Sequence, residues 1–130
     1  MTKAYFDSSA IVKLGHLESE SDALIDYLTD AQVSAATSVI ADVEVRRSLE
    51  RLRALGADPR EHVQGFFLID LNRDIRNRSV ALKPATLRSM DAIHLATALE
   101  IDGGLDFVTY DDRLAAAARE EGLRVVQPGR

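Results

Sequence analysis

Short β-prone runs alternate with helical patterns along the whole chain, and this alternation is the strongest constraint on the fold. Strands that alternate with helices are typical of a parallel sheet covered by helices on both faces. The sequence therefore predicts an α/β fold with a central parallel sheet and right-handed crossover connections. The predicted strands are 3–6, 32–37, 67–71, 106–110 and 123–128, and the predicted helices are 9–15, 20–30, 38–56, 72–82, 84–101 and 111–122.

Several helix boundaries carry specific signals. Ser38 is a suitable N-cap and Gly56 a suitable C-cap for the long helix between them. Pro59 and Pro84 have the residue type favoured at the first position of a helix, so a further helix is expected from residue 58 and another from Pro84. The chain shows no linker, repeat or low-complexity tract, and we expect a single domain over residues 1–130.

The formal net charge of −5 conceals an uneven distribution. Residues 46–88 contain ten Lys or Arg against five Asp or Glu, whereas the flanking segments 1–45 and 89–130 are both acidic. A basic segment of this kind is either a set of solvated helix faces or a surface for an acidic partner such as nucleic acid.

The composition also excludes some kinds of site. There is no cysteine, so the chain has neither disulfides nor thiolate metal sites. No apolar run approaches the ~20 residues of a membrane span, and the N-terminus lacks the apolar core of a signal peptide. We therefore expect a cytoplasmic protein with no membrane contact.

Asp91 is the one carboxylate in the segment 87–98, "LRSMDAIHLATA", which is otherwise almost free of charge. At helical spacing the apolar residues of this segment surround the axis, which predicts a buried helix. An unpaired carboxylate is costly in such a place. Either hydroxyls or Arg88 satisfy Asp91, or it faces a cation. His94, three residues later, is either a hydrogen-bonded core residue or a metal ligand.

Three further carboxylates stand at informative positions. Asp7 and Asp111 follow two predicted strands, and ligands of parallel sheets bind beyond the carboxyl ends of the strands. Each is also a suitable helix N-cap, and Glu44 can instead pair with Arg47 or Ser48 on its own helix. Carboxylates that are brought together raise one another's pKa, and a hard divalent cation removes this repulsion while leaving positions for water and phosphate oxygens. The set points to metal-dependent hydrolysis of a phosphodiester.

The same residues carry a resemblance to a known family. The stretches "YFDSSAIVK", "MDAIHLATAL" and "FVTYDDRLAAAAREEGLRVVQP", together with Glu44, resemble a PIN domain. More specifically, the chain is similar to VapC-type toxin ribonucleases of bacterial toxin–antitoxin pairs, and the resemblance covers essentially its whole length. It implies a three-layer sandwich whose parallel sheet has about five strands, with helices on both faces.

The resemblance also implies roles for individual residues. Asp7 and Asp91 would bind Mg²⁺ or Mn²⁺ directly, and two further acids would do so directly or through water. Ser9 and Thr109 match hydroxyl residues beside the metal-binding aspartates, and Asp112 is a possible substitute for its neighbour. The implied partners are an RNA substrate, a small cognate antitoxin and a second copy of the chain in a homodimer. The implied catalytic quartet is Asp7, Glu44, Asp91 and Asp111.

We therefore expect a metal-dependent endoribonuclease that acts on tRNA, rRNA or mRNA. A metal-activated water, helped by one carboxylate as base, would attack the phosphodiester. The arginines of the long basic helix are expected to contact RNA phosphates, and its leucines among charged neighbours are candidates for a protein interface. The arginines are Arg46, Arg47, Arg51 and Arg53, and the leucines are Leu49, Leu52 and Leu55.

Two other functions remain open from the residues. One is a PIN-like module that binds RNA or a protein partner without cleaving. The other is a receiver-type signalling domain with an acidic Mg²⁺ pocket. The receiver reading is disfavoured because Asp7 is followed by two serines and the last predicted strand carries no lysine.

Overall fold

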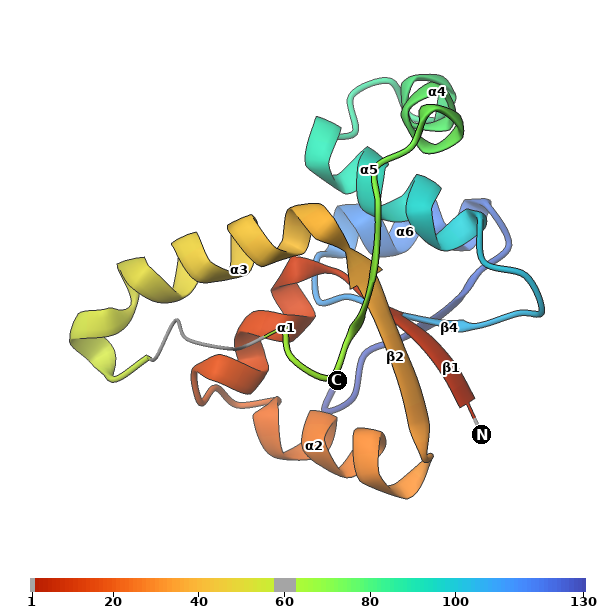
Figure 1. Ribbon diagram of the computed structural model, residues 1–130. Coiled ribbons are helices and arrows are strands. Elements are labelled where there is room, and N and C mark those ends of the chain that lie inside the picture. Colours follow the sequence, from red (N-terminus) through yellow and green to blue (C-terminus); the bar gives the residue numbers. More distant parts are fainter. Residues whose placement is uncertain (1, 58–62) are drawn as a thin grey trace.

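In the described part of the chain, the sheet consists of five strands in the order β3-β2-β1-β4-β5 (Figure 1). The computed structural model describes residues 2–57 and 63–130. Every neighbouring pair of strands is parallel, which confirms the prediction from the alternation of strands and helices. The strands are β1 (Thr2–Phe6), β2 (Val33–Ser38), β3 (Phe67–Ile69), β4 (Asp106–Val108) and β5 (Arg124–Val126).

Helices cover both faces of this sheet. Within the described residues they are α1 (Ser8–Gly15), α2 (Ser21–Asp30), α3 (Val39–Arg51), α4 (Arg73–Ala81), α5 (Ser89–Leu99), α6 (Asp112–Glu120) and a short 3₁₀ helix, η1 (Arg53–Leu55).

The two faces of the sheet contribute to two separate hydrophobic cores. Phe6 and Val108 pack with α1, α2 and α3, whereas their neighbours Tyr5 and Phe107 pack with α4, α5 and α6. Successive side chains of a strand point to opposite faces, so each short central strand serves both cores. The result is the expected three-layer sandwich.

Helix α3 buries one face at a spacing of four residues. Ala41, Val45 and Leu49 are fully buried in the core. The expectation that Leu49 lies at a protein interface is therefore wrong, because its helical position points to the sheet. Leu52 is partly buried against the same core, whereas Leu55 in η1 is 71% exposed.

Three predicted helix boundaries differ from the structure. Helix α5 begins at Ser89 rather than Pro84, because the Leu87 N–H bonds the Pro84 carbonyl in a turn and Arg88 is extended. Helix α3 ends before η1, and Gly56 closes η1 with a positive φ of 95°. The helix expected from Pro59 lies partly outside the described residues, and residues 63–65 form a turn.

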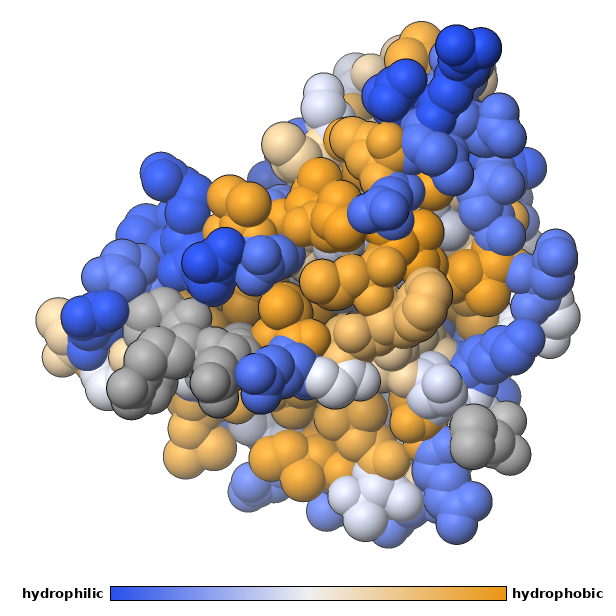
Figure 2. Space-filling view, viewed as in Figure 1, coloured by the Kyte–Doolittle hydropathy of each residue, from blue (hydrophilic) through white to orange (hydrophobic). Residues whose placement is uncertain are grey.

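Hydrophobic residues also gather at the centre of one face of the molecule (Figure 2). The edge strand β3 contributes Phe67, which is 73% exposed, and Leu68, and α3 contributes Val43. Large apolar side chains on an exposed sheet edge are typical of a surface that receives a protein partner. None of the helices in residues 2–57 and 63–130 has the length and apolar character needed to cross a membrane.

Candidate active site

A pocket of about 530 Å³ opens at the carboxyl ends of β1 and β4. These strands are parallel neighbours, with Phe6 opposite Val108, so the residues that follow them leave the sheet side by side. The four predicted acidic residues line this one pocket, and they come from the β1–α1 junction, α3, α5 and the β4–α6 junction. The four residues are Asp7, Glu44, Asp91 and Asp111.

Asp7 is buried at the floor of this pocket. Its Oδ1 accepts hydrogen bonds from the Ala10 N–H at 3.0 Å and the Ser9 hydroxyl at 2.7 Å, and its Oδ2 accepts one from the Thr109 hydroxyl at 2.5 Å. It therefore caps α1 and also faces the pocket. Burial raises the pKa of Asp7, although these hydrogen bonds and nearby His94 oppose the shift.

Asp111 combines the same two roles at the start of α6. Its Oδ1 accepts from the N–H groups of Arg113 and Leu114 at 2.9 and 3.0 Å, which leaves Oδ2 facing the pocket. The neighbouring Asp112 has an 88% exposed side chain and pairs with Arg130 at 3.3 Å. Of these two aspartates, the structure places Asp111 in the pocket.

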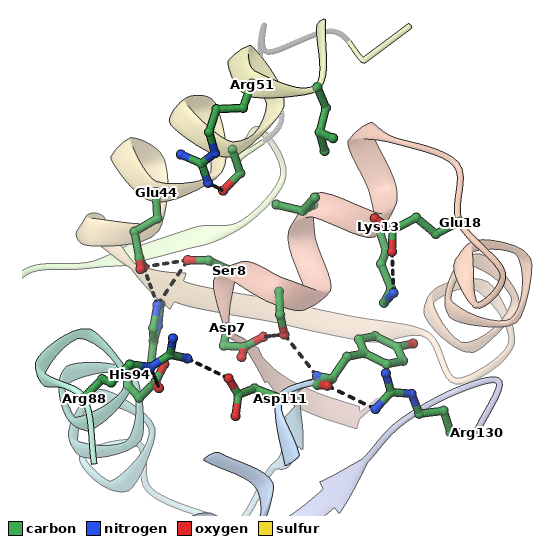
Figure 3. Close-up of a pocket in the computed structure, with 16 residues that line it drawn as sticks. Asp7, Ser8, Lys13, Glu18, Glu44, Arg51, Arg88, His94, Asp111 and Arg130 are labelled. Carbon is green, nitrogen blue, oxygen red and sulfur yellow. Dashed lines mark hydrogen bonds and ion pairs between the residues drawn. The ribbon is translucent and has the colours of Figure 1, made fainter. Parts of the chain in front are cut away.

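Glu44 is held by a chain of hydrogen bonds rather than by the expected partners on its own helix. Its Oε1 accepts the Ser8 hydroxyl at 2.6 Å and lies 2.7 Å from Nε2 of His94 (Figure 3). Nδ1 of His94 lies 2.6 Å from the hydroxyl of buried Tyr5. Burial strongly raises the pKa of Tyr5, so its hydroxyl stays protonated and donates to Nδ1. The remaining ring proton then lies on Nε2 and is donated to Glu44.

The hydrogen bonds to Glu44 decide its charge state. Burial alone would raise its pKa, but the bonds from His94 and Ser8 outweigh burial and hold the pKa below its usual range. Glu44 is therefore an anion at neutral pH. Its second oxygen, Oε2, accepts no hydrogen bond from the described residues.

Asp91 is paired with Arg88. The Arg88 Nε–H donates to its Oδ2 at 3.0 Å, and its side chain is 15% exposed toward the pocket. Burial raises the pKa of Asp91, the bond from Arg88 lowers it, and the charge of Asp111 raises it again, with a net upward shift. The arginine partner left open by the sequence is therefore present.

The donor set of the pocket matches a hard divalent cation in its chemistry. Four carboxylates converge on one space, and Mg²⁺ and Mn²⁺ prefer oxygen ligands. As they stand, however, no three Asp, Glu or His side chains in the described ranges are close enough to share an ion. Arg88 lies between two of the acids, since its Nη2–H also donates to Asp111 Oδ2 at 2.7 Å. The residues fit such a cation once this guanidinium moves aside.

The basic residues around the pocket are mostly not those expected from the sequence. Arg51 lines it, whereas Arg46 pairs with Asp42 along the outside of α3. Arg47 lines a separate surface hollow, and Arg53 pairs with Glu50. The cations that sequence reasoning missed are Lys13, Arg88 and Arg130.

These three cations were missed because they reach the pocket from segments far apart in the sequence. Ser8, Tyr5 and the role of His94 were missed for the same reason. A partial signal exists for His94, which lies one helical turn after Asp91 and so shares its face.

The comparison with known proteins agrees with this fold and site. The profile of the PIN domain family matches residues 4–120, and the chain belongs to this family.

Within the family, the chain groups with the VapC ribonucleases. It is 38% identical over 131 residues to Ribonuclease VapC47 of Mycobacterium tuberculosis (strain CDC 1551 / Oshkosh), with 96% of each protein covered. It is 39% identical over 135 residues to Ribonuclease VapC46 of M. tuberculosis (strain ATCC 25618 / H37Rv), covering 98% of this chain and 99% of that protein. Membership of this family rules out the receiver-type alternative.

Solved structures show the same fold. A toxin–antitoxin complex from Klebsiella pneumoniae superposes with a TM-score of 0.70 at 28% identity, covering 96% of this chain and 97% of that chain. VapBC2 from Rickettsia felis, bound to a DNA fragment from its promoter, also gives a TM-score of 0.70, at 12% identity and with coverage of 98% and 99%. At that identity the second match supports the fold alone.

Proposed function

We infer that this chain is a PIN-domain endoribonuclease, the toxin of a toxin–antitoxin pair, and we propose that it cleaves RNA with the help of Mg²⁺ or Mn²⁺. The observation that carries the proposal is the convergence of Asp7, Glu44, Asp91 and Asp111 on one pocket from four separate elements. Its closest support among known proteins is the ribonuclease name of relatives that match nearly the whole chain.

The chain's own residues divide the work of hydrolysis. In the proposed site Asp7 and Asp91 hold the cation, Asp111 assists, and Ser9 and Thr109 keep Asp7 oriented through their hydrogen bonds. A bound divalent cation supplies Lewis acidity, which acidifies water and polarises the phosphodiester.

Glu44 is the proposed general base. Its Oε1 is fixed by Ser8 and His94, and its Oε2 is available to take the proton of the attacking water. The water oxygen then bonds to phosphorus as the bond from phosphorus to the leaving oxygen breaks. Arg51, on the same wall of the pocket, is placed to contact a neighbouring phosphate.

Two protein partners follow from the same proposal. A small antitoxin would cover the acidic pocket with a basic side chain, as suits a pocket lined by four carboxylates. A second copy of the chain would form a homodimer. The exposed apolar residues Phe67 and Leu68 on edge strand β3, and Leu55 in η1, supply surface for such contacts. RNA as substrate makes the cytoplasm the proposed compartment.

Cleavage of purified RNA tests the proposed function. The parent protein should cut RNA with Mg²⁺ or Mn²⁺, and lose this activity in excess EDTA. The Asp91→Asn variant should leave RNA intact under all of these conditions, and end-mapping of RNA from cells that express each form identifies the cut. Full activity of the parent in EDTA without added metal would contradict the proposal, and binding of RNA without any cleavage would favour the non-cleaving alternative.

A further inference from the structure

Arg88 bridges two carboxylates of the pocket, although it is not one of the expected RNA-binding arginines. Its Nε–H donates to Asp91 at 3.0 Å, and its Nη2–H donates to Asp111 at 2.7 Å (Figure 3). The two acids belong to different elements, α5 and the β4–α6 junction. A single guanidinium therefore occupies the space between them.

The two sides of this contact differ in exposure. The Arg88 side chain is 68% exposed, whereas those of Asp91 and Asp111 are 15% and 26% exposed. The carboxylates are anchored, because Asp91 lies in the first turn of α5 and Asp111 caps α6. An ion pair with an exposed arginine adds little stability. Arg88 is therefore the partner that can leave when another cation competes.

The other cations that line the pocket do not contact the four acids. Lys13 pairs with Glu18 at 2.6 Å and Glu20 at 3.0 Å. Arg130 also binds Glu20, at 3.1 Å, and Arg51 donates to Ser48 on its own helix. Among the Lys and Arg side chains of residues 2–57 and 63–130, Arg88 alone pairs with the carboxylates of the proposed metal site.

We propose that Arg88 binds a phosphate of the RNA substrate beside the metal site, and that Asp91 and Asp111 hold it only until a divalent cation takes its place between them. This inference rests on the proposed function. The cation supplies the positive charge that Arg88 supplies in its absence, and it repels the guanidinium. The freed guanidinium presents planar N–H donors that match two phosphate oxygens.

The exchange makes Arg88 a competitor of the metal and a helper of the substrate. Its removal should therefore shift two measurable quantities in opposite directions. A residue that merely supports the fold would weaken both metal binding and RNA cleavage.

Metal binding without RNA is the first test. Mn²⁺ is titrated into the full-length parent, Arg88→Gln and Arg88→Lys by calorimetry, with Arg119→Gln as control because Arg119 is exposed at the far end of α6. Arg88→Gln should bind Mn²⁺ about two- to fivefold more tightly than the parent, the range expected for losing one exposed ion pair. Arg88→Lys and Arg119→Gln should stay near the parent. Unchanged or weaker binding in Arg88→Gln would overturn the proposal.

RNA cleavage at saturating Mn²⁺ is the second test, with a short single-stranded RNA that the parent cuts. Arg88→Gln should lose at least about tenfold in kcat/KM, as expected for one charge-assisted contact, and Arg88→Lys should recover part of the loss. The slope of log Kd for this RNA against log salt, measured with EDTA present to prevent cleavage, serves as a control and should not change, because Arg88 is then paired with the acids.

The outcomes separate this inference from the proposed function. If the parent does not cleave RNA in a metal-dependent way, the proposed function fails and this inference fails with it. If the parent cleaves and Arg88→Gln matches it in both Mn²⁺ affinity and kcat/KM, only this inference fails. If Arg88→Gln does not fold, Arg88→Lys decides, because parent-like kcat/KM in a variant without the planar fork contradicts two-oxygen binding.

Discussion

His94 Nε2 lies 2.7 Å from Glu44 Oε1, and this contact joins α5 to α3 across the carboxyl edge of the sheet. The two helices pack on opposite faces, so the imidazole connects the two hydrophobic cores at the pocket. Behind it, the Tyr5 hydroxyl fixes the other ring nitrogen at 2.6 Å. The orientation of Glu44 therefore depends on a residue of the central strand that does not line the pocket.

Replacing His94 by Gln should slow RNA cleavage by about 10- to 100-fold, the usual effect of losing a residue that orients a metal-site carboxylate. Since His94 does not contact the substrate, most of the loss should be in kcat rather than in KM. Steady-state kinetics measures both. His16→Gln is the matched control, because His16 lies just after α1 and outside the pocket, and it should cleave like the parent. Parent-like kcat in His94→Gln would show that Glu44 needs no such support.

Asp91→Asn should raise the melting temperature of the metal-free protein at pH 7. Burial raises the pKa of Asp91, so its ionised form is less favourable in the folded than in the unfolded chain. This cost develops as the pH rises above the ordinary aspartate pKa and is complete above the raised one. Asparagine removes it and gives up only an ion pair with exposed Arg88, which is worth little.

Thermal melts with EDTA and with Mg²⁺ check this prediction. Mg²⁺ should raise the melting temperature of the parent, because a ligand of the native state alone stabilises it, and should do much less for Asp91→Asn. A variant that melts below the parent in EDTA and responds equally to Mg²⁺ would mean that Asp91 is a structural residue.

Much of the fold and the location of the acids could be predicted from the sequence, because both depend on local patterns. Asp7 and Asp111 follow strands, and parallel strands bring such residues to one edge. The contact of Glu44 with His94 could not be predicted, since it depends on how two helices 50 residues apart cross the sheet edge. The error at Leu49 was avoidable, because its spacing from Ala41 and Val45 indicates a buried helix face.

Arg88 shows a different limit. A helix starting at Pro84 would have made it one residue of a regular helical surface. In the structure a turn ends at Leu87 and α5 starts at Ser89, which sends the Arg88 side chain across to Asp111. The conformation of this short loop depends on tertiary packing rather than on local propensity.

Arg51→Gln should flatten the salt dependence of RNA binding by about 0.7 in the slope of log K against log salt, the value for one lost phosphate contact on a single strand. Arg51 lines the pocket, whereas Arg47 lines a separate hollow on α3. Arg47→Gln is therefore the matched control, with the same charge change. Binding curves at several salt concentrations in EDTA give both slopes. Equal slopes for Arg51→Gln and the parent would remove Arg51 from the RNA surface.

Glu20→Gln should destabilise the protein at neutral pH but not in strong acid. Hydrogen bonds from Lys13, Ser19 and Arg130 lower the pKa of Glu20 to about 2. A carboxyl whose pKa is lowered on folding stabilises the fold above its ordinary pKa, and this contribution is lost as the pH falls through the folded value. Melting temperatures of parent and variant should differ at pH 7 and converge toward pH 2. A constant difference over this range would show that the carboxylate charge is not the cause.

The most direct measurement is diffraction from crystals soaked in Mn²⁺, recorded at the manganese absorption edge. The account predicts an anomalous peak bounded by the carboxylates of Asp7 and Asp91, within reach of Glu44 and Asp111, and none at that position in Asp91→Asn. It also predicts that the Arg88 guanidinium has left the space between Asp91 and Asp111. Soaked crystals of an active protein with no peak in this pocket, or with a peak bound elsewhere, would contradict the metal site.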